Sequence, residues 1–213
     1  MSANAVRGRD GGRASARIVA ICVAGLATLT ACVSAPPPAV WSGPAPETVV
    51  AEIRAAQAFA GSKATPGELE VQPLRDPMVD DLRQQAADLE RAKRYAEAAA
   101  ALDKALALSP DDPTLLQERA EAAMFLQDID RAETLARRAL ESGAQVGPLC
   151  RRHAATIAAA LRERAQQRRG QAAASRRDED RARFEHEARG ADARMRDAQR
   201  RIETCTLTGP PRY

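Results

Sequence analysis

The spacing of apolar residues predicts helices along most of the chain after residue 46. Between Glu47 and Ala60 the apolar side chains fall on one helical face, and Gly61 follows as a stop signal. These apolar positions are Val49, Val50, Ile53, Ala56 and Ala60. The next stretch alternates only briefly before it breaks at Pro73, which favours an extended connector over a sheet strand. We therefore expect one short helix and a connector ahead of the main folded region.

Two long segments near the C-terminus carry matching apolar seams. The later seam alternates spacings of four and three, which is a heptad pattern: Phe184, Ala188, Ala191, Met195, Ala198, Ile202 and Cys205. The earlier seam consists of Cys150, Ala154, Ile157, Leu161 and Ala165. If the chain reverses near residues 170–177, with Ser175 and Asp178 as an N-cap and capping-box acid, an antiparallel hairpin results. A single helix through residues 150–204 is the alternative, because a lone Gly costs a helix only about 1 kcal/mol.

The first 31 residues have the order of a secretion signal. Four arginines precede an apolar run from Ile18 to Leu29, and that run of about 12 residues is short of the roughly 20 that cross a bilayer. The run ends in Leu29-Thr30-Ala31-Cys32, which resembles the bacterial lipoprotein signal. The resemblance implies cleavage before Cys32 and attachment of acyl chains such as palmitate to its thiol and amine. An ordinary secretory signal with an incidental Cys is the alternative.

The resemblance also implies a location in the cell. Lipoproteins with Asp after the acylated Cys tend to stay in the inner membrane, whereas this chain has Val33. We therefore expect an outer-membrane lipoprotein that faces the periplasm. From Cys32 on, the chain has 28 basic and 28 acidic residues, so the net positive charge of the whole chain gives no reason to expect a nucleic-acid partner.

The middle of the chain resembles a tetratricopeptide repeat (TPR), a helix–turn–helix unit of 34 residues. A first unit starting at Val79 matches the family pattern at Leu82, Ala86, Leu89, Ala98, Leu102 and Pro110, and Gln85 departs from it. A second, degenerate unit starting at Pro113 matches at Leu116, Ala120, Ala123, Ala132 and Ala136. Small residues such as Ala86 and Ala98 let paired helices approach closely. In a third unit only the first helix fits, through Cys150, Ala154 and Ile157.

These patterns together predict an all-α fold, in which about two TPR-like units are covered at one end by an antiparallel hairpin. The expected organisation is a lipoprotein signal peptide over 1–31, a Pro-rich linker over 32–46, the short helix and connector over 47–77, TPR-like repeats over 78–147, the hairpin over 148–205 and a tail over 206–213.

The four cysteines fit an oxidising compartment. If the lipoprotein resemblance holds, Cys22 is removed with the signal and Cys32 is acylated, so that Cys150 and Cys205 remain, opposite each other in the predicted hairpin. We predict a disulfide between them; two reduced thiols, or disulfides between chains, are the alternative. Cys150, His153 and Cys205 could instead supply three metal ligands, but zinc sites usually show two close pairs. Neither a metal nor another cofactor is expected.

Catalysis finds no support in the sequence. His153 and His186 lie in no HExxH, GxSxG or P-loop pattern. We expect no enzyme activity. The hairpin from Arg151 to Glu203 carries 15 Arg against 9 acidic residues, which leaves open contact with anionic lipid, lipopolysaccharide or cell wall.

The TPR resemblance implies a groove, lined by the first helix of each unit, that binds a partner protein. The corresponding positions in this chain are Arg83, Ala87, Glu90, Gln117, Glu121, Met124 and Arg151, and Phe125 lies beside them. Family members that bind a carboxylate have Lys and Asn where this chain has Arg83 and Ala87. We expect a periplasmic adaptor or scaffold for an unidentified envelope protein. A structural envelope-surface protein is the alternative, and self-association stays open.

Overall fold

The computed structural model describes residue 41 and residues 43–57 and 76–205. The predicted signal peptide, the acylation site Cys32, most of the Pro-rich linker, most of the connector and the tail lie outside the described residues.

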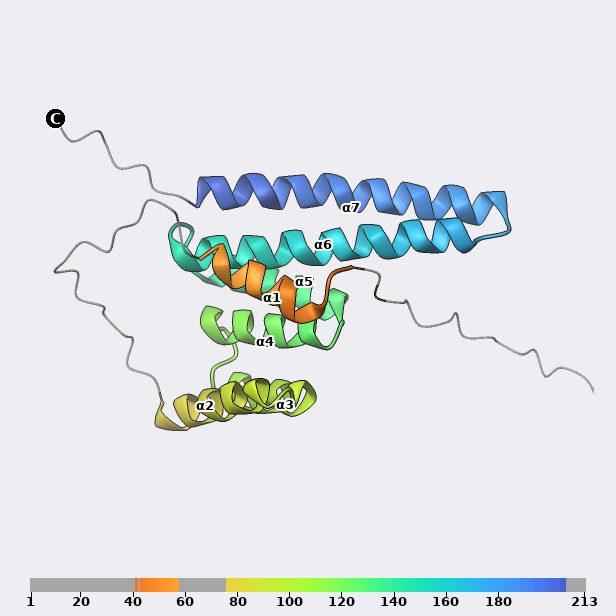
Figure 1. Cartoon of the computed structure of the whole chain (residues 1–213). Helices are drawn as coiled ribbons and strands as arrows, with labels where there is room; N and C mark the ends of the chain where they lie inside the picture. Colours follow the sequence, from red (N-terminus) through yellow and green to blue (C-terminus); the bar gives the residue numbers. More distant parts are fainter. Residues whose placement is uncertain (1–40, 42, 58–75, 206–213) are drawn as a thin grey trace, which may run out of the picture. The chain divides into compact units, whose positions relative to one another are not determined.

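The described residues form helices and no strand (Figure 1). The elements are α1 (Pro46–Ala55), α2 (Pro77–Arg91), α3 (Tyr95–Leu108), α4 (Pro113–Phe125), α5 (Ile129–Ser142), α6 (Pro148–Ala174) and α7 (Asp178–Thr204). The all-α prediction is therefore confirmed. None of the described helices is both long enough and apolar enough to cross a membrane.

The 34-residue period is visible in the backbone. Lys93 and Gln127 stand 34 positions apart, and both adopt positive φ angles, of 58° and 60°. In each case the residue after it donates its N–H back to the preceding helix, Arg94 to Leu89 and Asp128 to Ala123, at 2.8 and 2.9 Å. This left-handed residue is a common way to end a helix in a tight turn. The α2–α3 and α4–α5 hairpins thus share one turn geometry.

Aspartates and prolines begin two of the first helices. The Asp76 side chain accepts the N–H of Met78, the Asp112 side chain accepts those of Thr114 and Leu115, and a Pro follows each Asp. An N-cap carboxylate satisfies backbone donors that have no partner within the helix, and Pro at the next position has no such donor. The sequence therefore marks the starts of α2 and α4 locally.

Alanine fills the contacts between neighbouring helices. Ala86 of α2 and Ala98 of α3 are buried in one cluster, as the repeat pattern predicts. Leu116 and Ala120 of α4 pack with Leu135 and Ala136 of α5 in the next cluster, which continues to Ile157 of α6. Each hairpin therefore packs on the following one, and the core runs along the array.

The hairpin of α6 and α7 covers the end of the array (Figure 1). The chain reverses between Ala174 and Asp178, so the alternative of one long helix is wrong. Both predicted seams face each other: Ile157, Leu161 and Ala165 of α6 pack with Ala191 and Ala198 of α7. Cys150 and Cys205 are joined by a disulfide with their Cα atoms 5.6 Å apart. Nearby, Gly147, at φ 92°, donates its N–H to the Cys205 carbonyl at 2.7 Å.

The predicted capping box at the start of α7 is wrong. Arg177 is the N-cap residue, and no side chain caps the helix. The Ser175 hydroxyl instead exchanges local hydrogen bonds with the backbone of Arg177. Such local hydrogen bonds from Ser compete with capping, which explains the difference.

Removing the disulfide should destabilise the domain. It closes a loop with a sequence separation of 55, for which the chain-entropy model gives about 4 kcal/mol. A Cys150→Ala/Cys205→Ala variant should lose about 2–4 kcal/mol of unfolding free energy in urea, and adding reductant to the native protein should lower stability comparably. Unchanged stability in both cases would contradict the prediction.

Candidate protein-binding groove

The first helices of the repeat units, α2, α4 and α6, share one face, and α1 lies on part of it (Figure 1). Val49, Val50 and Ile53 of α1 are at most 2% exposed and pack against Met124 of α4. The rest of this cluster comes from Ala123, Ile129, Ala132, Ala159 and Ala160. The apolar face predicted for the short helix is therefore buried against the repeats.

A buried carboxylate, that of Glu121 on α4, lies at the centre of this contact. Its side chain is fully buried and accepts the Nε of Arg54 at 2.8 Å, two nitrogens of Arg152 at 2.5 and 2.7 Å, and the Nε2 of Gln117 at 2.8 Å. Burial alone would raise the pKa of this carboxyl. The hydrogen bonds and positive charge of Arg152, with the charge of Arg54, outweigh that effect and hold the pKa below its usual value.

A buried polar chain continues from Glu121 into α6. The Nε2 of Gln117 also donates to the Thr156 hydroxyl at 2.7 Å, and its Oε1 lies 2.8 Å from Nδ1 of His153. Because Gln117 uses its amide as the donor to Glu121, its oxygen must accept, and His153 therefore carries its proton on Nδ1. The His153 Nε2 is buried and has no hydrogen-bond partner among the described residues.

Arg54 joins α1 to two other helices, α2 and α4. Besides Glu121, it binds both carboxylate oxygens of Glu90 on α2, at 2.7 and 2.9 Å. Its guanidinium also lies 5.9 Å from the ring centroid of Phe125, which stacks on Tyr95 at 4.4 Å. The hydrogen bonds to Glu90 and the charge of Glu121 raise the pKa of Arg54, so it stays charged.

Arg151 recognises the C-terminal end of α1. Its buried side chain donates to the backbone oxygens of Ala56 and Gln57, at 3.2 and 2.8 Å. The last carbonyls of a helix have no partner within the helix, so a guanidinium there satisfies them.

The sequence-predicted groove residues thus lie together, but α1 covers most of them. Gln117, Glu121 and Met124 are fully buried, Arg151 is 6% exposed, and Phe125 packs partly buried beside α1. Of the predicted positions, Arg83 and Glu90 line open space. The occupancy by α1 was missed by sequence reasoning, although the unpartnered face of Val49, Val50 and Ile53 was the signal that pointed to it.

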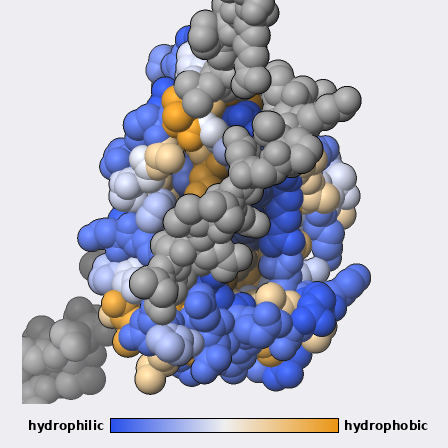
Figure 2. Space-filling model, turned by 90° about the vertical axis from the view of Figure 1, so that its left-hand side faces the viewer, coloured by the Kyte–Doolittle hydropathy of each residue, from blue (hydrophilic) through white to orange (hydrophobic). Residues whose placement is uncertain are grey.

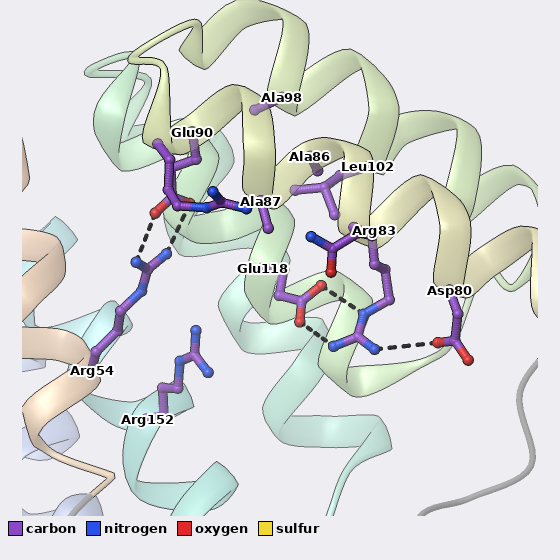
Figure 3. A pocket seen from close by; sticks show the side chains of 12 residues that line it. Arg54, Asp80, Arg83, Ala86, Ala87, Glu90, Ala98, Leu102, Glu118 and Arg152 are labelled. Atoms are coloured by element: carbon purple, nitrogen blue, oxygen red, sulfur yellow. Dashed lines mark hydrogen bonds and ion pairs between the residues drawn. The ribbon is translucent and has the colours of Figure 1, made fainter.

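An open pocket of about 620 Å³ remains beside α1 (Figure 3). Arg83 and Glu118 form an ion pair across it, with contacts of 2.9 and 2.5 Å, and Arg83 also reaches Asp80 at 3.4 Å. The pocket is further lined by Arg54, Gln84, Ala86, Ala87, Glu90, Arg91, Ala98, Leu102 and Arg152. The basic and acidic groups of this pocket can hydrogen-bond a peptide segment, and the small apolar side chains beside them can contact its apolar atoms.

Residues 89–161 match a family model described as tetratricopeptide repeat. This segment of the chain is similar to tetratricopeptide repeats. This segment runs from the end of α2 to the middle of α6 and includes most of the residues that contact α1. A search among curated proteins found no match. Such repeats are protein-interaction modules, and the match indicates no enzyme family.

The described part of the chain gives little support to the other sites considered from the sequence, a metal site and a basic surface. Cys150 and Cys205 are bonded to each other, and no group of three or more His, Cys, Asp or Glu could hold a metal ion in residues 41, 43–57 and 76–205. Many hairpin arginines form ion pairs, such as Arg168 with Glu187 at 2.8 Å and Arg181 with Asp178 at 2.8 Å. Seen from the left-hand side of Figure 1, the surface that is not grey is mostly hydrophilic, with hydrophobic residues in patches (Figure 2).

The buried His153 should make stability depend on pH. Burial, and secondarily the charge of Arg152, lowers its pKa from 6.5 to about 4, so the folded protein keeps it neutral while the unfolded chain takes up a proton. The contribution of neutral His153 to the unfolding free energy should be fully present above pH 6.5. It should fall by up to about 3 kcal/mol as the pH drops towards 4.

Urea unfolding at a series of pH values would measure this effect. His153→Gln should flatten the slope between about pH 6.5 and 4.5, above the range in which the lowered pKa of Glu121 matters. His186→Gln, at an exposed site of α7, is the matched control and should keep the slope. An unchanged slope in His153→Gln would contradict the assignment.

Proposed function

We propose that this chain is a lipid-anchored adaptor on the periplasmic face of the bacterial outer membrane, where it binds an envelope protein during assembly or maintenance. The observation that carries the proposal is the open pocket on the face shared by α2, α4 and α6. In tetratricopeptide repeats this face is the one that binds partners.

The pocket suits a polar peptide segment. The side chains of Arg83, Glu118 and Glu90 are 25%, 23% and 28% exposed, so each ion pair is partly accessible to solvent. Exposed ion pairs contribute little to stability and exchange readily for contacts with a ligand. Ala87 and Leu102 provide apolar contact surface next to them.

The disulfide supports the proposed compartment. Disulfides persist in oxidising environments such as the bacterial periplasm and are rare in the cytosol. In the sequence, Cys150 and Cys205 are far from the lipoprotein-like Leu29-Thr30-Ala31-Cys32, so the disulfide and the signal are separate features that both support a periplasmic location.

The Arg-rich hairpin gives less support to the alternative of an envelope-surface protein. Ion pairs with acidic neighbours on α7 and α6 neutralise many of its arginines, including Arg169 with Asp192 and Arg200 with Asp197. A mixed, paired surface attracts anionic lipid less than a uniformly basic one.

Photo-crosslinking in living cells tests the adaptor function. A crosslinking amino acid at Gln84, an exposed residue of the pocket wall, should yield a discrete adduct that mass spectrometry identifies as one protein. Glu141, exposed on α5 away from the pocket, is the matched control and should not yield it. Equal adducts from both positions, or lipid adducts alone, would overturn the proposal.

The anchor makes a separate prediction. Cys32→Ser should move the protein from the membrane fraction to the soluble periplasmic fraction, because a diacylated Cys with further acylation supplies the chains needed for stable anchoring. Mass spectrometry of the native protein should find an N-terminal acylated Cys32. An unmodified Cys32 in the membrane-bound native protein would contradict this prediction.

A further inference from the structure

Four residues that contact α1, namely Glu90, Glu121, Met124 and Arg151, stand at positions that line the ligand groove in tetratricopeptide repeats. Met124 packs on Val49, Val50 and Ile53, Glu121 and Glu90 bind Arg54, and Arg151 binds the C-terminal carbonyls. We call the surface formed by Glu90, Glu121, Met124, Arg151 and the alanines Ala123, Ala159 and Ala160 the α1 seat. Here α1 is held in the way that a partner helix would be held.

The α1 seat selects a definite kind of helix. The apolar cluster accepts aliphatic side chains at two adjacent positions and at the position three further on, as in Val49, Val50 and Ile53. Glu121 and Glu90 select an arginine next to the last of these. Arg151 fixes where the helix ends, because it binds free carbonyls. The recognised segment is therefore about three turns long.

The departure of α1 would leave no buried charge without a partner at Glu121. That carboxylate keeps both hydrogen bonds from Arg152 and the one from Gln117. Glu90 is 28% exposed and Arg54 is 42% exposed, so water can reach both. Breaking a buried ion pair is costly chiefly when it strands a charge, and this arrangement avoids that outcome.

The apolar part of the seat behaves differently. Met124, Ala123 and Ala160 are fully buried in the cluster that they form with Val49, Val50 and Ile53, and they would lose these apolar partners if α1 left. Burial of such side chains is the main source of binding free energy, so the emptied seat favours another amphipathic helix. A helix of ten residues is also marginal by itself, so α1 depends on the seat for its helical form.

We propose that the α1 seat is the partner's binding site and that α1 is a built-in occupant, which an amphipathic helix of the partner displaces. That helix carries aliphatic residues spaced as Val49, Val50 and Ile53 are, followed by an arginine. This inference rests on the adaptor function proposed above and specifies the partner's chemistry.

A peptide with the sequence of residues 46–57 serves as the probe. Fluorescence anisotropy measures its binding to two proteins. The parent chain carries Cys32→Ser, and the variant carries in addition Val50→Asp and Ile53→Asp, which expel α1 from the seat. The variant should bind the peptide at least tenfold more tightly than the parent chain, because its own α1 no longer competes. A peptide carrying Ile53→Asp should not bind.

The control variant has Thr48→Asp and Ala51→Asp, which add the same charges to the exposed side of α1. It should bind the peptide as weakly as the parent chain. Equal affinity for both variants, or no binding to the expelled variant, overturns the proposal. Circular dichroism shows whether the expelled variant keeps its helices.

Hydrogen exchange of the unaltered chain gives a test that needs no variant. The amides of α1 should exchange at least tenfold faster than those of α4 and α6, since α1 leaves the seat without unfolding of the repeats. Protection of α1 equal to that of α4 and α6 would overturn the proposal. A dimer in solution that the Val50→Asp/Ile53→Asp change abolishes would assign the seat to a second copy's α1 and also overturn it.

The adaptor function can survive that failure. A discrete Gln84 adduct without exchange of α1 would leave the open pocket as the binding site and remove only the proposed displacement. Peptide exchange without any Gln84 adduct would support the seat and count against the pocket.

Discussion

The arrangement of the repeat face depends on one buried charge, the carboxylate of Glu121. A buried carboxylate without partners would cost several kcal/mol. Arg152 of α6, Arg54 of α1 and Gln117 of its own helix supply four donors to it. Because these partners come from elements far apart in the sequence, Glu121 links α1, α4 and α6 through hydrogen bonds. Arg54 extends the same network to Glu90 on α2.

The hairpin of α6 and α7 provides the other constraint. Arrays of helical repeats expose an apolar face at each end, and the long α7 covers α6 along the seam of Ala188, Ala191 and Ala198. The disulfide fixes the open end of the hairpin, next to Arg151 and Arg152 on the first turns of α6. The cap therefore holds rigid the helix that supplies two arginines to the α1 contact.

The fold was largely predictable because its signals are local or periodic. The 34-residue repeat predicts α2 to α5, and the heptad seams predict α6 and α7. The expected oxidising compartment and the hairpin register together predict the disulfide between Cys150 and Cys205. The position of α1 was not predictable, because the spacing of Val49, Val50 and Ile53 shows that a face needs burial but not which surface covers it. Likewise, Glu121 and Met124 were assigned to the groove, but only the structure shows that α1 contacts them. The prediction of a Ser175 cap was wrong because residue spacing does not show that the Ser175 hydroxyl forms a competing local hydrogen bond.

A double-mutant cycle between Arg54 and Glu121 tests most directly whether this pair holds α1 on the repeats. Unfolding free energies of Arg54→Ala, Glu121→Ala and the double variant give the coupling between the two side chains. The structure predicts a coupling of at least about 1 kcal/mol, because one partner is fully buried and the pair is hydrogen-bonded at 2.8 Å. Additive effects, with a coupling near zero, would show that Arg54 does not bind Glu121 in solution and would contradict the placement of α1.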